Sequence, residues 1–262
     1  MNVTKAHAYG NDFLYVREAD VRGRALDLLA RELCDRHTGI GADGLIVYEP
    51  NAAGASMRLL NADGSPSDVS GNGIRGLAAI VLRADRRAGL EVTIATPAGA
   101  KRLERLAVNG SRQTFRAAMG TPRDIRRHTV QAAGEPIEVV TLDIGNPQCL
   151  VLGPLPADDR FHRLGPALER HSAFAAGTNV EFVRVDAPDR VTIRIWERGV
   201  GPTLSSGTGA CASLVAAASF GGAARDAAVT APGGVQRVEW RDDGVFLTGW
   251  AEILFDSRWL RD

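Results

Sequence analysis

Two copies of a short Ser-Gly-x-Gly sequence constrain this chain more than any other feature. The first copy spans Ser70–Gly73 and the second Ser206–Gly209, and each precedes an apolar run long enough for a helix. A turn of small residues that opens into a helix presents free backbone N–H groups and the positive end of the helix dipole. Each copy therefore predicts a helix start that can bind an anion such as a carboxylate.

The two copies belong to a longer internal repeat with an offset of 135 or 136 residues. Its matching pairs keep the same order in both halves of the chain: Gly10 with Gly145, Asn11 with Asn146, Asp43 with Asn179, Asn61 with Glu197, Pro66 with Pro202 and Pro97 with Pro232. Chance matches do not stay in order over such a span. The chain is therefore predicted to consist of two diverged copies of one fold, each with one Ser-Gly-x-Gly helix start.

Composition narrows the class of protein. A chain of 262 residues that is 45% hydrophobic can form two ordinary cores. Basic and acidic residues both number 31, and this balance argues against a nucleic-acid or membrane-surface partner. Cys34, Cys149 and Cys211 have no paired spacing, so neither a disulfide framework nor a zinc site is indicated. The polar start of the chain lacks the pattern of a signal peptide, and we expect a cytoplasmic protein.

Hydrophobic periodicity predicts helices over residues 24–37, 74–83, 160–171 and 210–220. Alternating patterns predict strands over residues 2–7, 13–16, 44–48, 56–60, 90–106, 137–144, 180–185, 191–196, 229–240 and 245–255. The expected fold class is α/β (α+β), with mostly antiparallel strands around one central helix in each half. We place an N-terminal domain at residues 1–112 plus 251–262 and a C-terminal domain at 113–250, with the ligand between the two halves.

Nine motifs in the chain, in this order, resemble those of the diaminopimelate epimerase family: HAYGNDF, TGIGADGL, LNADGS, SGNGIR, IGNPQ, GTNVEF, WERGVGPT, SGTGAC and TAPGG. Members of this family are cofactor-independent enzymes that interconvert L,L- and meso-2,6-diaminopimelate, a precursor of lysine and peptidoglycan. The resemblance implies two pseudo-symmetric domains, each a curled sheet around a central helix, with the active site in the cleft. It also implies a diamino dicarboxylic acid as substrate, no cofactor and a possible homodimer.

The resemblance assigns a role to each matching position. The side chains that hold the amino and carboxylate groups of the substrate match Asn11, Asn61, Asn146, Asn179, Glu197 and Arg198. The backbone donors around the reacting carboxylate match Gly71, Asn72, Gly207 and Thr208. Asparagine suits a zwitterionic ligand because one neutral amide offers both donors and acceptors. Arginine suits the distal carboxylate because its guanidinium group can bind both oxygens.

The chain departs from the family at the reacting groups. The family has cysteine before each Gly-x-Gly, as thiolate base on one face of the α-carbon and thiol acid on the other, whereas this chain has Ser70 and Ser206. A helix N-terminus can bring a thiol pKa into range, but a hydroxyl needs a neighbouring base. The family's histidine after Gly-Asn-Pro is Gln148 here, while Glu197 is retained. Cys149 and Cys211 are expected to be packing residues.

Three interpretations follow. The chain is an epimerase of this family whose cysteines were replaced by engineering or by natural divergence; or it is a non-catalytic binder of a diamino acid; or it is a related amino-acid racemase or isomerase. The candidate catalytic residues are Ser70, Ser206, Glu197 and Gln148. The four asparagines and Arg198 favour a substrate with a second charged centre, and hence diaminopimelate.

Overall fold

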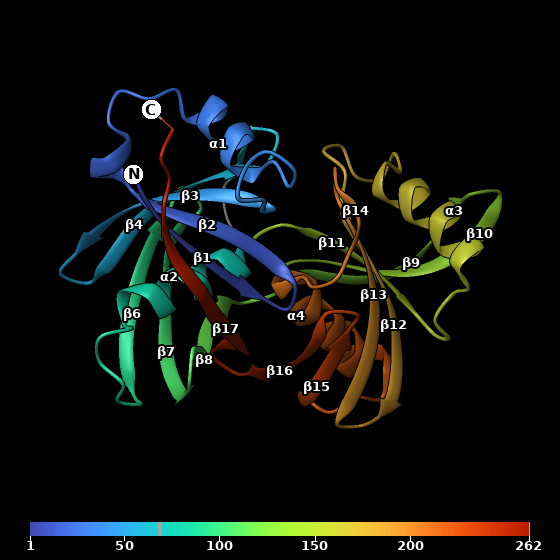
Figure 1. Cartoon of the computed structure of the whole chain (residues 1–262). Coiled ribbons are helices and arrows are strands. Elements are labelled where there is room, and N and C mark those ends of the chain that lie inside the picture. Colours follow the sequence, from blue (N-terminus) through green and yellow to red (C-terminus); the bar gives the residue numbers. More distant parts are fainter. Residues whose placement is uncertain (68–69, 262) are drawn as a thin grey trace. The chain divides into compact units, whose positions relative to one another are not determined.

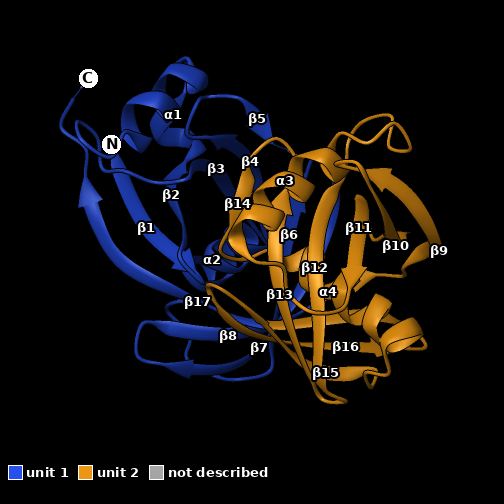
Figure 2. Cartoon of the chain, turned by 90° about the vertical axis from the view of Figure 1, so that its right-hand side faces the viewer, with its two compact units in different colours: residues 1–117, 249–262 blue, residues 118–248 orange. Residues whose placement is uncertain are grey.

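The computed structural model describes residues 1–67 and 70–261, and the chain forms two compact units (Figures 1 and 2). Unit 1 comprises Met1–Ala117 and Gly249–Asp262, and unit 2 comprises Ala118–Thr248. Strands predominate and helices are few, which confirms the predicted mixed α and β class. In the part of the chain that is described, no helix has the length and apolar character needed to span a bilayer.

Each described helix and strand lies entirely in unit 1 or in unit 2, except for two strands that cross from one unit to the other. Unit 1 contains β1 (Asn2–Ala8), β2 (Asn11–Arg17), the 3₁₀ helix η1 (Glu18–Val21), α1 (Leu26–Cys34), β3 (Gly44–Asn51), β4 (Gly54–Asn61), β5 (Pro66–Ser67), α2 (Gly71–Val81), β6 (Leu90–Thr96) and β7 (Gly99–Asn109). Unit 2 contains β9 (Arg123–Ala132), β10 (Glu135–Asp143), β11 (Pro147–Leu152), α3 (Asp158–Glu169), β12 (Asn179–Ala187), β13 (Arg190–Glu197), β14 (Gly201–Thr203), α4 (Gly207–Ala216), the π-helical turn η2 (Ala217–Gly221), β15 (Asp226–Ala231) and β16 (Gly234–Arg241). The chain passes between the units along β8 (Arg112–Gly120) and β17 (Gly244–Arg258).

The strands of the two units pair in the same pattern. In unit 1, β1–β2, β3–β4, β6–β7 and β7–β8 are antiparallel, whereas β2–β3 and β4–β6 are parallel. In unit 2, β10–β11, β12–β13, β15–β16 and β16–β17 are antiparallel, whereas β11–β12 and β13–β15 are parallel. Each parallel pair is joined by a helix, because parallel neighbours need a crossover connection. The helices α1 and α2 make the crossovers of unit 1, and α3 and α4 make those of unit 2.

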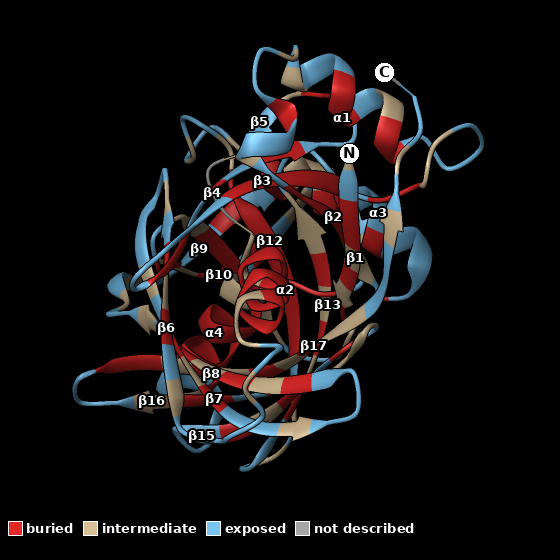
Figure 3. Cartoon of the chain, turned by 60° about the vertical axis from the view of Figure 1, so that its left-hand side comes forward, coloured by how far each residue is buried: buried red, intermediate tan, exposed pale blue. Residues whose placement is uncertain are grey.

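Each sheet has a different helix on each of its two faces. In unit 1, α1 packs on Leu14, Val16, Leu45 and Val47, and α2 lies on the face that carries Tyr15. In unit 2, α4 packs on the face that includes Leu150, while α3 packs on the face that includes Cys149 and Phe182. Figure 3 shows the consequence: α2 and α4 are buried over most of their length.

The central helices match their predicted positions, and the strands between the two halves were partly missed. Residues 112–120 form β8 and residues 123–132 form β9, where no strand was predicted. Most side chains of β9 are exposed, including the arginines of its Arg123–Arg127 portion, so this strand lacks the alternation that marks a half-buried strand. The helix predicted over residues 210–220 is α4, followed by the π-helical turn η2.

Gly76 on α2 provides a test of how tightly the central helix of unit 1 is packed. A Cβ atom at this position would overlap the hydroxyl of Tyr15 and lie 2.8 Å from its Cζ, while that hydroxyl donates to the carbonyl oxygen of Gly73 at 3.0 Å. We expect Gly76→Ala to lower the free energy of unfolding by about 1–3 kcal/mol through overpacking. Urea unfolding would measure this. In a Tyr15→Phe background the same substitution should cost less, and an equal cost in both backgrounds would contradict this packing.

Candidate active site

The two serines of the Ser-Gly-x-Gly sequences are the N-caps of α2 and α4. Ser70 and Ser206 have nearly the same extended backbone, with φ/ψ of −130°/121° and −132°/127°. The Oγ atom of Ser70 accepts a hydrogen bond from Gly73 N at 3.1 Å, and that of Ser206 accepts one from Gly209 N at 3.1 Å. Serine is a favoured N-cap for this reason. The serines thus have a structural role that the motif alone did not reveal, although serine before a predicted helix is its usual signal.

The cap bonds leave other donors of the first helical turn directed along the helix axis. The N–H groups at the first and second helical positions belong to Gly71 and Asn72 in α2, and to Gly207 and Thr208 in α4. These early N–H groups have no carbonyl partner inside the helix and carry the positive end of its dipole. Each helix start can therefore accept one carboxylate group.

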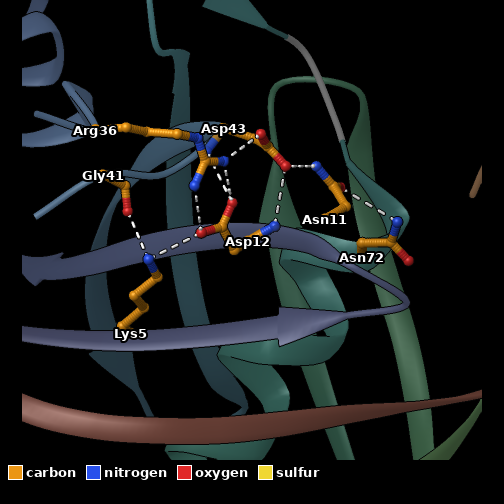
Figure 4. A network of polar contacts seen from close by, with 7 residues as sticks. All are labelled: Lys5, Asn11, Asp12, Arg36, Gly41, Asp43 and Asn72. Atoms are coloured by element: carbon orange, nitrogen blue, oxygen red, sulfur yellow. Dashed lines mark hydrogen bonds and ion pairs between the residues drawn. The ribbon is translucent and has the colours of Figure 1, made fainter. Parts of the chain in front are cut away.

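In unit 1, Asn11 and Asn72 lie together at the end of a polar network (Figure 4). Asn72 Nδ2 donates to Asn11 Oδ1 at 3.2 Å, and Asn11 Nδ2 donates to Asp43 Oδ2 at 2.7 Å. Asp43 is held in turn by Arg36 Nη2, 2.9 Å from its Oδ1. Asn72 Oδ1 accepts from Arg75, which is buried in α2. Because a carboxylate can only accept, Asp43 fixes which end of the Asn11 amide faces Asn72.

Asp12 anchors the same network from β2. Its carboxylate accepts from Arg36 Nη2 at 2.8 Å, lies 2.9 Å from Lys5 Nζ, and also bonds the backbone N–H of Asp43. Burial alone would raise the pKa of Asp12, but the hydrogen bonds from Arg36 and Lys5 hold it below its usual value. Sequence reasoning missed Asp12, Arg36 and Asp43, because acidic and basic residues at strand ends look like ordinary turn residues.

Asn61 makes its side-chain hydrogen bond within its own turn. Its Nδ2 donates to Ser65 Oγ at 2.9 Å within the turn after β4, and its side chain is exposed. The structure thus gives Asn61 a turn-forming role, and its role toward substrate stays a prediction.

In unit 2, three predicted site residues lie together: Asn146, Gln148 and Thr208. Gln148 is fully buried on β11, and its Nε2 donates to Asn146 Oδ1 at 2.7 Å. Asn146 Nδ2 lies 3.4 Å from Thr208 Oγ1 at the start of α4. A fourth residue, Glu181 of β12, is also fully buried and lies within 3.2 Å of the Gln148 amide. Sequence reasoning missed Glu181, because one acid within an apolar strand has no pattern.

Glu197 is the carboxyl group beside Ser206. Burial raises the pKa of Glu197, and the hydroxyl groups of Ser206 and Thr203 oppose that rise. Ser206 itself is buried, with 7% of its surface exposed. A carboxyl group with a raised pKa next to a hydroxyl is an arrangement suited to a general acid or base.

Arg198 follows Glu197 and keeps its side chain exposed. Its backbone N–H donates to Asn179 Oδ1 at 3.0 Å, and its Nη1 donates to the carbonyl oxygen of Ala176 at 3.2 Å. The next residue, Gly199, donates its N–H to Glu169 Oε1 at 2.8 Å. Asn179 and Glu169 therefore hold the loop that presents the guanidinium group to solvent.

The three cysteines are buried, as expected for packing residues. Cys149 lies on the α3 side of its strand, whereas its neighbour Gln148 contacts Thr208 of α4, so the two residues occupy opposite faces as the strand period requires. Over residues 1–67 and 70–261, no group of three or more histidine, cysteine or acidic side chains is arranged to hold a metal ion.

Solved structures identify the class of fold. The chain matches a predicted epimerase from Pseudomonas aeruginosa with a TM-score of 0.75 at 16% identity, over 100% of this chain and 99% of the other. It matches a probable proline racemase from Agrobacterium radiobacter with a TM-score of 0.74 at 16% identity, over 100% and 93%. At this identity the likeness shows the fold alone, which is that of these two proteins.

Sequence comparison narrows the class to one family. The family model for diaminopimelate epimerase matches residues 3–124 and 140–254, so the chain belongs to the diaminopimelate epimerase family. A protein named diaminopimelate epimerase from Desulforudis audaxviator is 43% identical over 281 aligned positions, which cover 100% of both chains. Another of that name from Desulfitobacterium hafniense is 38% identical over 100% of this chain and 99% of its own. The resemblance inferred from the nine motifs is confirmed.

Asp43 allows the unit 1 network to be tested. Asp43→Asn replaces one accepting oxygen by a donor that would face Asn11 Nδ2, Asp12 N or Arg36, and we expect the free energy of unfolding to fall by about 1–3 kcal/mol. Urea unfolding measures the effect, with the exposed Asp189→Asn as a charge-matched control. Equal stabilities of the two variants would show that Asp43 does not hold this network.

Proposed function

We propose that this protein binds 2,6-diaminopimelate and interconverts its L,L and meso forms by proton transfer at one α-carbon, without a cofactor. One observation carries the proposal: the family match spans the chain, and the chain keeps the asparagines, Glu197, Arg198 and both Gly-x-Gly helix starts that the family's binding motifs require. The product would serve lysine and peptidoglycan precursor synthesis. A cytoplasmic homodimer is part of the same proposal.

The binding chemistry suits a substrate with two amino acid centres. The N–H groups at the start of α2 and α4 suit the carboxylate of the reacting centre, since each offers donors and a positive dipole end. The exposed guanidinium group of Arg198 suits the distal carboxylate. The amides of Asn11, Asn72 and Asn146 offer acceptors to the amino groups and donors to the carboxylates. A substrate with a single charged centre would leave the second set of partners unused, which favours diaminopimelate over a simple amino acid.

The reaction needs one group that removes the α-proton and another that returns a proton to the opposite face. We assign these positions to Ser70 and Ser206, with Glu197 and Gln148 as their neighbours. Serine is a poor base unless a neighbour accepts its proton. Ser206 has such a neighbour in Glu197, whose raised pKa favours proton uptake. Ser70 has no comparable partner among the contacts described above, so we expect slow turnover.

Slow turnover is also compatible with the second interpretation, a protein that binds a diamino acid without catalysis. The cap bonds of Ser70 and Ser206 give each serine a structural reason to be present that is independent of catalysis. A protein that binds diaminopimelate without epimerising it would retain every binding residue named here. Turnover, rather than binding, therefore distinguishes the two.

Arg198 tests the binding half of the proposal. We expect Arg198→Ala to weaken diaminopimelate binding by about 2–5 kcal/mol, the cost of removing one partner of a charge pair that bound substrate would bury. Titration calorimetry with meso-diaminopimelate measures this loss. Arg190→Ala, on an exposed site of β13, is the control. Equal affinities of the Arg198 variant and the unmodified protein would contradict the assignment of the distal carboxylate.

The serines test the catalytic half. We expect Ser70→Cys combined with Ser206→Cys to raise the epimerisation rate by about two orders of magnitude or more, the contribution typical of a positioned acid or base. Each single replacement should recover less, because the reaction needs one group on each face. The same replacements remove good N-caps, so each should lower the free energy of unfolding by about 0.5–2 kcal/mol.

Exchange of the α-hydrogen in deuterated water reports turnover directly. Slow exchange by the unmodified protein and faster exchange by the double variant support the assignment. Fast exchange by the unmodified protein that the double replacement leaves unchanged would place the bases at other residues.

A further inference from the structure

Glu181 is a fully buried carboxyl group for which the reaction described above has no use. It lies on β12 in the row that faces α4, where the next residue of the row, Val183, belongs to the apolar cluster around that helix. Its Oε1 atom contacts α4 so closely that a Cβ atom at residue 209 would overlap it, which explains the glycine there. An apolar side chain would avoid the desolvation cost of a buried carboxyl group. The acid is therefore expected to make a specific polar contact.

The Gln148 amide supplies that contact and raises a conflict. Gln148 Oε1 lies 3.1 Å from Glu181 Oε2 and 3.2 Å from Glu181 Oε1, so three oxygen atoms face one another. The opposite end of the amide, Nε2, donates to Asn146 Oδ1 at 2.7 Å and lies 3.3 Å from Thr208 Oγ1. If Glu181 were ionised, Gln148 would have to turn its amide around. Its oxygen would then face Asn146 Oδ1 at 2.7 Å, and Asn146 would have to turn as well.

A proton on Glu181 removes the conflict without turning any amide. The carboxyl O–H then donates to Gln148 Oε1, Gln148 Nε2 donates to Asn146 Oδ1, and Asn146 Nδ2 points to Thr208 Oγ1 at 3.4 Å. Every group in this series has a partner of the opposite kind. We propose that Glu181 is a neutral, proton-donating carboxyl group that fixes the amide orientation of Gln148 and Asn146, and with them the contact to Thr208. Glu181 is thus a positioning residue, with no contact to substrate required.

The surroundings of Glu181 favour the neutral form. Burial raises the pKa of Glu181 well above its usual value, and Glu197 on β13 raises it further. The titratable side chains on the other neighbouring elements are the buried thiols of Cys149 on β11 and Cys211 on α4. Burial raises the pKa of Cys149, so that thiol is neutral and supplies no countercharge.

The proton has a predictable effect on stability that requires no ligand. The usual glutamate pKa of about 4.3 applies to the unfolded chain, and the pKa in the folded chain is higher. Between these two pKa values the folded chain holds one proton more than the unfolded chain, so stability falls as the pH rises through this range. The measured quantity is the unfolding equilibrium constant of the unmodified protein divided by that of Glu181→Gln. Between about pH 5 and 8 this ratio should rise by up to about tenfold for each pH unit.

Glu169→Gln is the matched control for this measurement. Glu169 is a buried carboxylate of the same unit, and it accepts from Trp196 Nε1 at 2.9 Å and from Gly199 N at 2.8 Å. Burial opposes ionisation, but these bonds hold the pKa of Glu169 below its usual value. The ionised form of Glu169 is therefore already fully populated in the folded chain at pH 5. The unfolding constant of the unmodified protein, divided by that of Glu169→Gln, should stay constant from pH 5 to pH 8. If the unfolding constant of the unmodified protein divided by that of Glu181→Gln also stays constant, Glu181 is ionised and the proposal is overturned.

The positioning role is tested by ligand binding, and this step rests on the proposed function. At neutral pH, Glu181→Gln should bind meso-diaminopimelate about as well as the unmodified protein, because its amide N–H can still donate to Gln148. Glu181→Leu removes the donor and should bind about tenfold more weakly, the effect of one lost hydrogen bond. Rising pH should weaken binding to the unmodified protein more than binding to Glu181→Gln.

The outcomes separate the two proposals. Equal pH dependence of binding in the unmodified protein and Glu181→Gln, or unweakened binding by a folded Glu181→Leu, would overturn the positioning role. If none of the three proteins binds diaminopimelate, the proposed function fails, and the unfolding measurements alone decide whether Glu181 holds its proton.

Discussion

The hydrogen bond that the third N–H of a buried helix donates to a serine hydroxyl is the interaction on which both helix starts depend. It fixes where α2 and α4 begin, and so which N–H groups remain for a ligand. The two glycines of the motif serve the same purpose by another route. Gly73 and Gly209 let the first turn approach Ile46 and Glu181 more closely than a Cβ would allow. The motif is thus a packing and capping device first, and an anion site as a result.

The amide groups next to these helices gain their orientation from neighbouring carboxyl groups that play opposite parts in hydrogen bonding. In unit 1 the carboxylate of Asp43, bound by Arg36, accepts the N–H of Asn11 and leaves the Asn11 oxygen to Asn72. In unit 2 the neutral Glu181 would donate, so Gln148 turns its oxygen inward and its N–H toward Asn146. Arg36 lies beside the carboxylate in unit 1, whereas burial and, to a lesser extent, a second carboxyl group keep the proton on Glu181 in unit 2, and this accounts for the difference.

The sequence was sufficient for the features that depend on periodicity. The central helices, the opposite faces of Gln148 and Cys149, and the burial of the cysteines all follow from spacing, because spacing decides which face a side chain occupies. It was insufficient for β9, whose exposed arginines mask the strand pattern. It was also insufficient for Asp43 and Glu181, because the role of an acid depends on which groups the fold brings to it from distant parts of the chain.

The same reasoning explains why serine is compatible with this fold at the positions where the family has cysteine. A hydroxyl is the better helix cap and a thiol the better acid, so the residue before each Gly-x-Gly is subject to two opposed demands. Serine satisfies the first and leaves the second to neighbours. In unit 2 such a neighbour is the carboxyl group of Glu197, and burial raises the pKa values of both Glu197 and Glu181. The proton proposed on Glu181 leaves Glu197 as the carboxyl group that can accept a proton from Ser206, so the fold and not the serine itself supplies the base.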